Sequence, residues 1–163
     1  MTGQPAAVYL LLKLVHVAAV IAFLGNITTG LFWHAHAART RDPRLLAHVV
    51  DGLIRSDRLF TIPGVVVIIA SGLVAAVAGG HPILGTPWIL WSLVLFSLSG
   101  LAFVLRVAPL QVRLRALAQA GAERGPFDWD GYRRVALVWE RWGLAALLTP
   151  VAALVLMVLK PVL

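Results

Sequence analysis

The fold is decided by residues 59–105, which read LFTIPGVVVIIASGLVAAVAGGHPILGTPWILWSLVLFSLSGLAFVL and contain no Asp, Glu, Lys or Arg. One crossing of a bilayer needs about 20 apolar residues, so a charge-free stretch of this length must cross twice. Glycine and proline mark the turn between the crossings, at GGHP (79–82) and GTP (85–87). The stretch therefore predicts membrane spans at 59–78 and 88–105, joined by a short connection at 79–87.

Two further spans flank this pair, at residues 8–33 and 142–159, where the sequence is again apolar. Apolar residues make up 60% of the chain and charged residues 13%, against roughly 45–50% and about 25% in soluble domains. We therefore expect one all-α domain over 1–163, a polytopic membrane protein built as a four-transmembrane-helix bundle. The chain has no cysteine, which excludes disulfides, thiolate metal sites and thiol catalysis.

The basic residues predict the orientation of this bundle. Of the 14 basic residues, 12 lie within 34–58 and 106–141, whereas 79–87 contains none. Because Lys and Arg near span ends are retained in the cytoplasm, we expect the first two segments to be cytoplasmic connections and 79–87 to be a short outer one. Both chain termini should then lie outside a bacterial inner (plasma) membrane. We expect the first span to be retained rather than cleaved, because no positively charged region precedes its long apolar part.

The charge pattern also predicts which molecules the protein contacts. The formal charge of +7 is explained by topology, so it predicts contact with anionic lipid headgroups and no binding of nucleic acid. The sequence has no glycine-rich phosphate loop, nucleophile elbow or paired carboxylates, and no carboxylate lies inside a predicted span. Small residues recur along the spans and allow close helix packing. They are compatible with a partner in a larger membrane complex or with a homo-oligomer.

Local signals predict structure within the connections and the last span. Asp42-Pro43 is a helix start, and apolar residues at 45, 46, 49, 50, 53 and 54 share one face, which predicts a helix that could lie on the inner membrane surface. The second connection should be helical past Pro109, with breaks at Gly121 and Gly125. Pro150 should bend the last span near Ala146, where Thr149 would help satisfy the freed carbonyl.

His16 is the main candidate for chemistry, because it is the only histidine well inside a predicted span. An ionisable group at that depth is costly and indicates function by default. Imidazole can bind haem iron or copper or relay a proton; the alternative is a hydrogen bond across the bundle. Lys13 lies one turn outward, where it would either reach the outer surface or pair with an anionic group such as a haem propionate.

Two further residues are predicted to lie on the same side of the membrane as His16. Met157 falls in the outer part of the bilayer, and His81 lies in the outer connection, so the three side chains could converge. Such a set could bind haem through His/Met or bis-His ligation, and it could also bind copper. The alternatives are that Met157 packs in the core and His81 is an exposed loop residue. His34, His36 and His48 could form a cytoplasmic metal site, but no carboxylates or thiols cluster with them in the sequence.

Several motifs carry a family resemblance that extends over nearly the whole chain. They are YLLLKLVHV at 9–17, RLFTIPG at 58–64, SG at 71–72, PW at 87–88, PLQ at 109–111 and MVLKP at 157–161. Together they resemble a bacterial family of predicted integral membrane proteins of unknown function. More distantly, LKLVH at 12–16 and the Lys160-Pro161 ending are similar to HemJ-type protoporphyrinogen oxidases, and the general plan is similar to copper-resistance D proteins.

The HemJ resemblance implies that His16 is a haem ligand. That family also has an essential lysine in its third helix, whereas residues 88–105 contain neither Lys nor His. We therefore do not expect protoporphyrinogen oxidase activity. The first hypothesis is binding of b-type haem, with His16, Lys13 and Met157 as cofactor-binding residues, for electron transfer, haem handling or sensing. The alternatives are a cofactor-free accessory or scaffold subunit, and copper handling at the outer face by His16, His81 and Met157.

Overall fold

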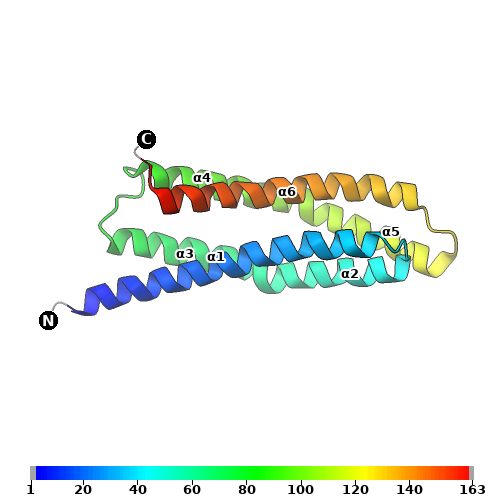
Figure 1. Ribbon diagram of the computed structural model, residues 1–163, viewed down its shortest axis with the longest axis horizontal. Coiled ribbons are helices and arrows are strands. Elements are labelled where there is room, and N and C mark those ends of the chain that lie inside the picture. Colours follow the sequence, from blue (N-terminus) through cyan, green and yellow to red (C-terminus); the bar gives the residue numbers. More distant parts are fainter. Residues whose placement is uncertain (1–2, 162–163) are drawn as a thin grey trace.

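The computed structural model describes residues 3–161, and every regular element in that range is a helix. The elements are α1 (Gly3–Ala38), α2 (Pro43–Ser56), η1 (Asp57–Thr61), α3 (Ile62–Ala78), α4 (Pro87–Ala102), η2 (Phe103–Val107), α5 (Ala108–Arg124) and α6 (Trp129–Leu159). Because η1 and η2 join their neighbours without a break, the chain forms four long antiparallel helices (Figure 1). All four are long and apolar enough to cross a membrane, which confirms the expected all-α bundle.

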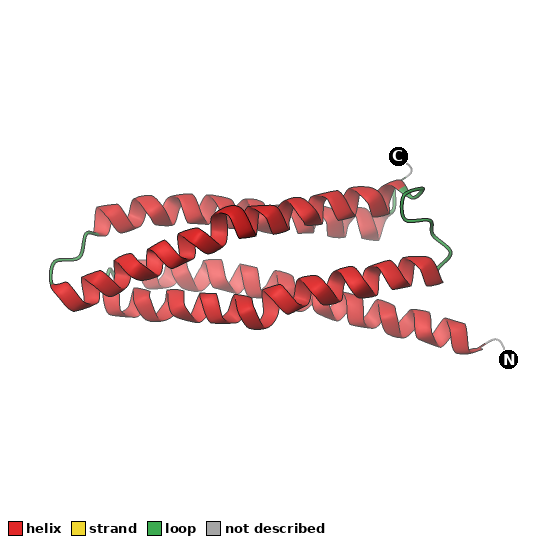
Figure 2. Cartoon of the chain, turned by 180° about the vertical axis from the view of Figure 1, so that it is seen from behind, coloured by secondary structure: helices red, strands yellow, loops and turns green. Residues whose placement is uncertain are grey.

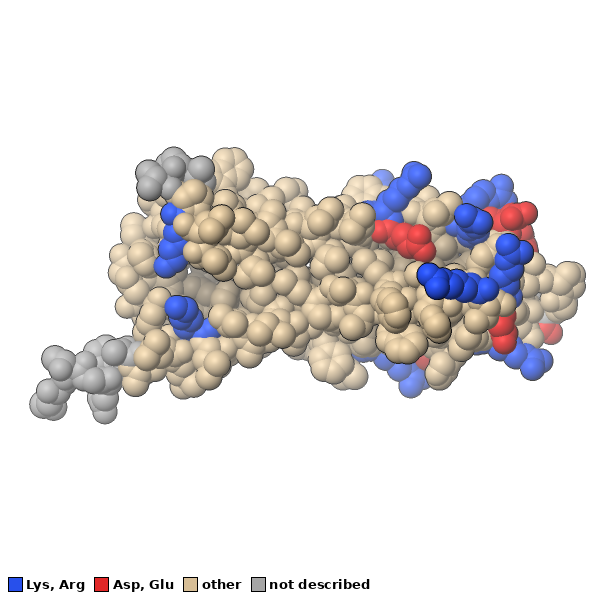
Figure 3. Space-filling model, viewed as in Figure 1, with Lys and Arg blue, Asp and Glu red and all other residues tan. Residues whose placement is uncertain are grey.

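The long helices extend well beyond the thickness of a membrane. They contain 31 to 37 residues, which corresponds to about 46–56 Å at 1.5 Å per residue. The hydrocarbon core of a bilayer measures only about 30 Å. In both views α1 begins, and α6 ends, at the same end of the bundle as the 79–87 connection (Figures 1 and 2). We call this end of the bundle the cavity end. The Arg, Asp and Glu side chains gather at the opposite end, which we call the charged end (Figure 3).

The helix predicted to lie on the membrane surface is instead part of the bundle. Asp42 caps α2 as expected, since its carboxylate accepts a hydrogen bond from the Arg44 backbone N–H at 2.8 Å. However, the apolar face of α2 packs against α5, and Leu46 and Val50 are completely buried. This helix was misplaced because an amphipathic pattern shows that one face is covered but not what covers it. The expected break at Gly121 is also wrong, because α5 continues to Arg124.

Two wide helical turns interrupt the long helices, and each one directly precedes a proline. In η1 the Ile62 N–H donates to the carbonyl of Asp57, and in η2 the Ala108 N–H donates to that of Phe103, both five residues back. The following residues, Pro63 and Pro109, have no N–H. A proline ring also clashes with the carbonyl four residues before it. Widening the preceding turn makes room for the ring while the helix continues.

Serines of α4 fasten that helix to α6. Ser99 Oγ donates to the carbonyl of Ala146 at 2.6 Å, and Ser92 Oγ donates to the carbonyl of Ala153 at 3.2 Å. The Ala146 carbonyl is the one that Pro150 leaves without its helical donor. Thr149 donates to Ala145 instead, so its predicted role was wrong. The missing donor is Ser99 of the neighbouring helix α4. The spacing of residues within the last span could not predict this contact.

Candidate functional site

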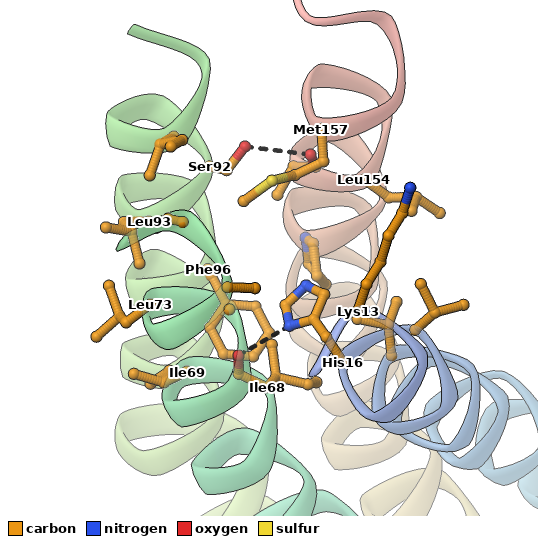
Figure 4. A pocket seen from close by; sticks show the side chains of 18 of the residues that line it. Lys13, His16, Ile68, Ile69, Leu73, Ser92, Leu93, Phe96, Leu154 and Met157 are labelled. Atoms are coloured by element: carbon orange, nitrogen blue, oxygen red, sulfur yellow. Dashed lines mark hydrogen bonds between the residues drawn. The ribbon is translucent and has the colours of Figure 1, made fainter. Parts of the chain in front are cut away.

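A cavity of about 560 Å³ lies at the cavity end, between α1, α3, α4 and α6. At this end α1 packs mainly on α3 and α4 mainly on α6, so the cavity separates two helix pairs. Its walls are largely apolar and include Val20 and Phe23. Figure 4 shows four more of the apolar wall residues, Ile68, Leu73, Phe96 and Leu154. Cofactor pockets have volumes of roughly 300–1,000 Å³ and walls of this kind. The cavity is therefore large enough for an extended organic ligand.

His16 contributes an imidazole to the cavity in a fixed orientation. Its Nδ1 lies 2.9 Å from the backbone carbonyl of Ile68 on α3, and Ser71 Oγ lies 3.3 Å from the same nitrogen (Figure 4). Because a carbonyl can only accept, Nδ1 must donate, so the neutral ring presents a lone pair at Nε2. Among the side chains that the structure describes (7–123 and 125–161), this second nitrogen has no hydrogen-bond partner. One nitrogen thus makes the expected bond across the bundle, and the other is free to bind a ligand.

Gly72 allows the imidazole to approach α3. A Cβ atom at this position would lie 2.9 Å from Cε1 of His16 and 3.0 Å from Nδ1. Both distances are too short for a side chain, so the ring lies directly against the glycine backbone. The SG motif at 71–72 therefore supplies a hydroxyl beside the imidazole and the space that the imidazole occupies.

The other site residues predicted from the sequence line the same cavity. Lys13 and Met157 reach it from α1 and α6, and His81 reaches it from the 79–87 connection. His81 is half-buried and contacts the Trp88 ring edge-on, with 5.6 Å between the ring centroids. Lys13, His16, His81 and Met157 thus line one cavity, although they come from three separate parts of the sequence. No lysine of α4 lines the cavity, because the third predicted span (88–105) contains no Lys.

The histidines near the charged end do not form the metal site considered from the sequence. His34 is completely buried: its Nε2 lies 3.0 Å from the Tyr132 hydroxyl, and its Nδ1 lies 3.3 Å from Oε1 of Glu140. His36 packs against Phe32 on its own helix. Within residues 3–161 no three His, Asp or Glu side chains are grouped closely enough to hold a metal ion. His34 instead joins α1 to α6.

A buried polar cluster halfway along the bundle was missed by sequence reasoning. Oδ1 of Asp57 accepts from Asn26 Nδ2 at 3.1 Å and from Thr61 Oγ1 at 2.7 Å, and Oδ2 accepts from Gln111 Nε2 at 2.8 Å. Asp57 begins the wide turn η1 and is almost fully buried. The signal was present in α2, because Val50, Leu53 and Asp57 are spaced as one helical face. The position lies just outside the predicted span, so the carboxylate was assigned to a solvated connection.

Comparison with known families and proteins gives one match. A model of the family described as "Predicted integral membrane protein (DUF2269)" matches residues 10–161, nearly the whole chain. The chain therefore belongs to this family, which confirms the resemblance noted in the sequence and, with the four long apolar helices, identifies a protein of the lipid bilayer. No curated protein and no solved structure matches the chain.

Proposed function

We propose that this membrane protein binds b-type haem in the cavity, with Nε2 of His16 as an axial ligand. The hydrogen bond from His16 Nδ1 to the Ile68 carbonyl carries the proposal. Metal-binding histidines almost always donate their second ring N–H in this way, which fixes the tautomer and strengthens the free nitrogen as a ligand. The same imidazole lines an apolar cavity that is large enough for the cofactor.

The remaining features of the cavity suit the same cofactor. The walls are apolar and include Phe23 and Phe96, whose rings lie 5.4 Å apart. Met157 enters from the helix pair opposite α1, and we propose its sulfur as the second ligand, with His81 as the alternative. Non-covalent haem is the form to expect, because the chain has no cysteine for covalent attachment. Haem bound in this way could serve electron transfer, haem handling or sensing.

We further propose that the charged end faces the cytoplasm of a bacterium and that the cavity opens toward the outer side of the inner membrane. The arginines are confined to residues 39–141 and surround the charged end. Arg106 packs over the Trp142 ring at 5.6 Å, a pairing suited to the headgroup level of a membrane. These cations would meet anionic headgroups on the inner leaflet.

An absorption spectrum of the protein purified in detergent from haem-sufficient cells tests the cofactor. We expect a Soret band, with sharpened bands after reduction by dithionite, at near one haem per chain. His16→Ala should remove this haem, whereas His36→Ala should retain it, because His36 is exposed and lies outside the cavity. Copper without haem, lost in His16→Ala and Met157→Ala, would favour copper handling instead. A colourless protein without metal would favour an accessory subunit.

A further inference from the structure

Both lysines of the chain line the cavity, although the other twelve basic residues are arginines at other positions. Lys13 lies on α1, one turn before His16. Lys160 directly follows α6 in a left-handed conformation, with φ of 45°. Figure 3 shows Lys side chains on both sides of a hollow at this end of the molecule. The two cations therefore reach one cavity from opposite helix pairs.

No Asp or Glu side chain lines the cavity beside these lysines in the described part of the chain. The seven acidic residues all lie between Asp42 and Glu140, in the segments that form the middle and the charged end of the bundle. Within residues 3–161 every ion pair also lies outside the cavity end. A cation beside an apolar wall is costly unless it reaches water or meets an anion. Among the described residues, the cavity lining thus contains two basic side chains and no acidic one.

Both lysines line the cavity, and Lys160 also makes a contact that places its ammonium group. Lys160 Nζ lies 5.1 Å from the centre of the Trp88 ring, which fixes it at the edge of the cavity. Figure 4 shows Lys13 extending past His16 toward Leu154 of α6. Because His16 lines the same cavity as the two lysines, a ligand that binds His16 and fills the cavity would also meet both lysines.

We propose that Lys13 and Lys160 form an anion clamp that selects a tetrapyrrole with free carboxylates. This inference rests on the proposed function and extends it, because it names the second recognition element and the chemical class of the ligand. The apolar macrocycle occupies the cavity, and its two carboxylates pair with the two ammonium groups. The clamp acts on the periphery of the ligand, so it works whether or not the ring contains iron.

Four ligands test the clamp on protein freed of endogenous ligand: haemin, its dimethyl ester, metal-free protoporphyrin and the dimethyl ester of that porphyrin. The wild type should bind each diacid at least about tenfold more tightly than its ester, a difference of ~1.4 kcal/mol. The double variant Lys13→Gln/Lys160→Gln should bind diacid and ester equally. Lys13→Arg/Lys160→Arg should restore the preference. Arg39→Gln, which removes an exposed cation outside the cavity, should leave it unchanged.

Two results would overturn the clamp while haem ligation stands. One is equal binding of haemin and its ester by the wild type with a normal Soret band. The other is competition by phosphatidylglycerol that weakens haemin binding in the wild type but not in the glutamine variant, which would assign the lysines to a lipid headgroup. Conversely, lysine-dependent binding of metal-free porphyrin, with no change of the haemin spectrum in His16→Ala, would support the clamp and contradict the ligand role of His16. Size-exclusion profiles identical to the wild type establish that each variant is folded.

Discussion

Gly72 decides how close the His16 imidazole can come to α3. A Cβ would be only 2.9 Å from the ring, so any larger residue must push the imidazole away from the Ile68 carbonyl. The hydrogen bond that orients Nε2 is therefore set by a residue with no side chain. Serine at position 71 and glycine at 72 act together, one beside the ring and the other beneath it.

Gly72→Ala should reduce haem content or shift the Soret band while the protein stays folded. The added methyl group displaces the ring, and its cost is confined to the cavity. Gly25→Ala on α1 is the matched control, because a Cβ there meets nothing within 4 Å. That control should keep its haem and gain a little stability from the better helix former, by up to about 1 kcal/mol. An unchanged spectrum in Gly72→Ala would show that the orientation of His16 does not matter for binding.

At the scale of the helices, each proline that interrupts a long helix lies near a polar side chain that bonds to another helix. Pro63 and Pro109 follow wide turns, and Asp57 and Gln111, which lie at or beside those turns, bond to each other at 2.8 Å. Pro150 leaves the Ala146 carbonyl to Ser99. In each case the polar partner comes from another helix, so the helices are held in a defined register.

Ser99→Ala should lower the thermal midpoint measured in detergent by about 2–4 °C, because the Ala146 carbonyl would lose its donor and hydrogen bonds between membrane helices contribute ~1 kcal/mol. Ser97→Ala on the same helix is the control: Ser97 is exposed and makes no side-chain bond in the described part of the chain. Equal midpoints for the two variants would indicate that water or a shifted backbone replaces the serine.

The sequence was most informative where the signal is local. The charge-free stretch, the Asp42-Pro43 helix start and the depth of His16 all follow from nearby residues, and they led to the helices and to one wall of the cavity. Contacts between residues that are far apart in the sequence could not be predicted. His34 meets Tyr132 98 residues further on, and Asp57 meets Gln111 54 residues further on. Both contacts depend on how the helices face one another, which periodicity does not specify.

On the scale of the whole molecule, charge divides the bundle along its long axis. The arginines and all the acidic residues belong to the middle and the charged end, whereas the other end has only the two cavity lysines (Figure 3). The exposed surface of α3 and α4 is apolar, with Val66, Val77 and Leu98 among its large exposed side chains. This distribution suits a molecule partly in lipid and partly in water.

Fusions of reporter enzymes to the C-terminus should show that it lies outside. Alkaline phosphatase should be active there and a cytoplasmic fluorescent protein dark, because the proposed orientation places the arginine-rich end in the cytoplasm. Fusions at the N-terminus must give the same answer, since α1 begins and α6 ends at one end of the bundle. The reverse activities would invert the topology, and opposite results at the two termini would contradict the bundle itself.

The continuity of the long helices has a mechanical consequence. The backbone that forms one wall of the cavity in α3 runs on through η1 into α2, and that of α4 runs on through η2 into α5. A ligand that separates the two helix pairs must either bend these wide turns or move α2 along α5. A displacement of the cavity walls would therefore be carried along continuous helices to α2 and α5, so that binding in the cavity changes the opposite end of the bundle.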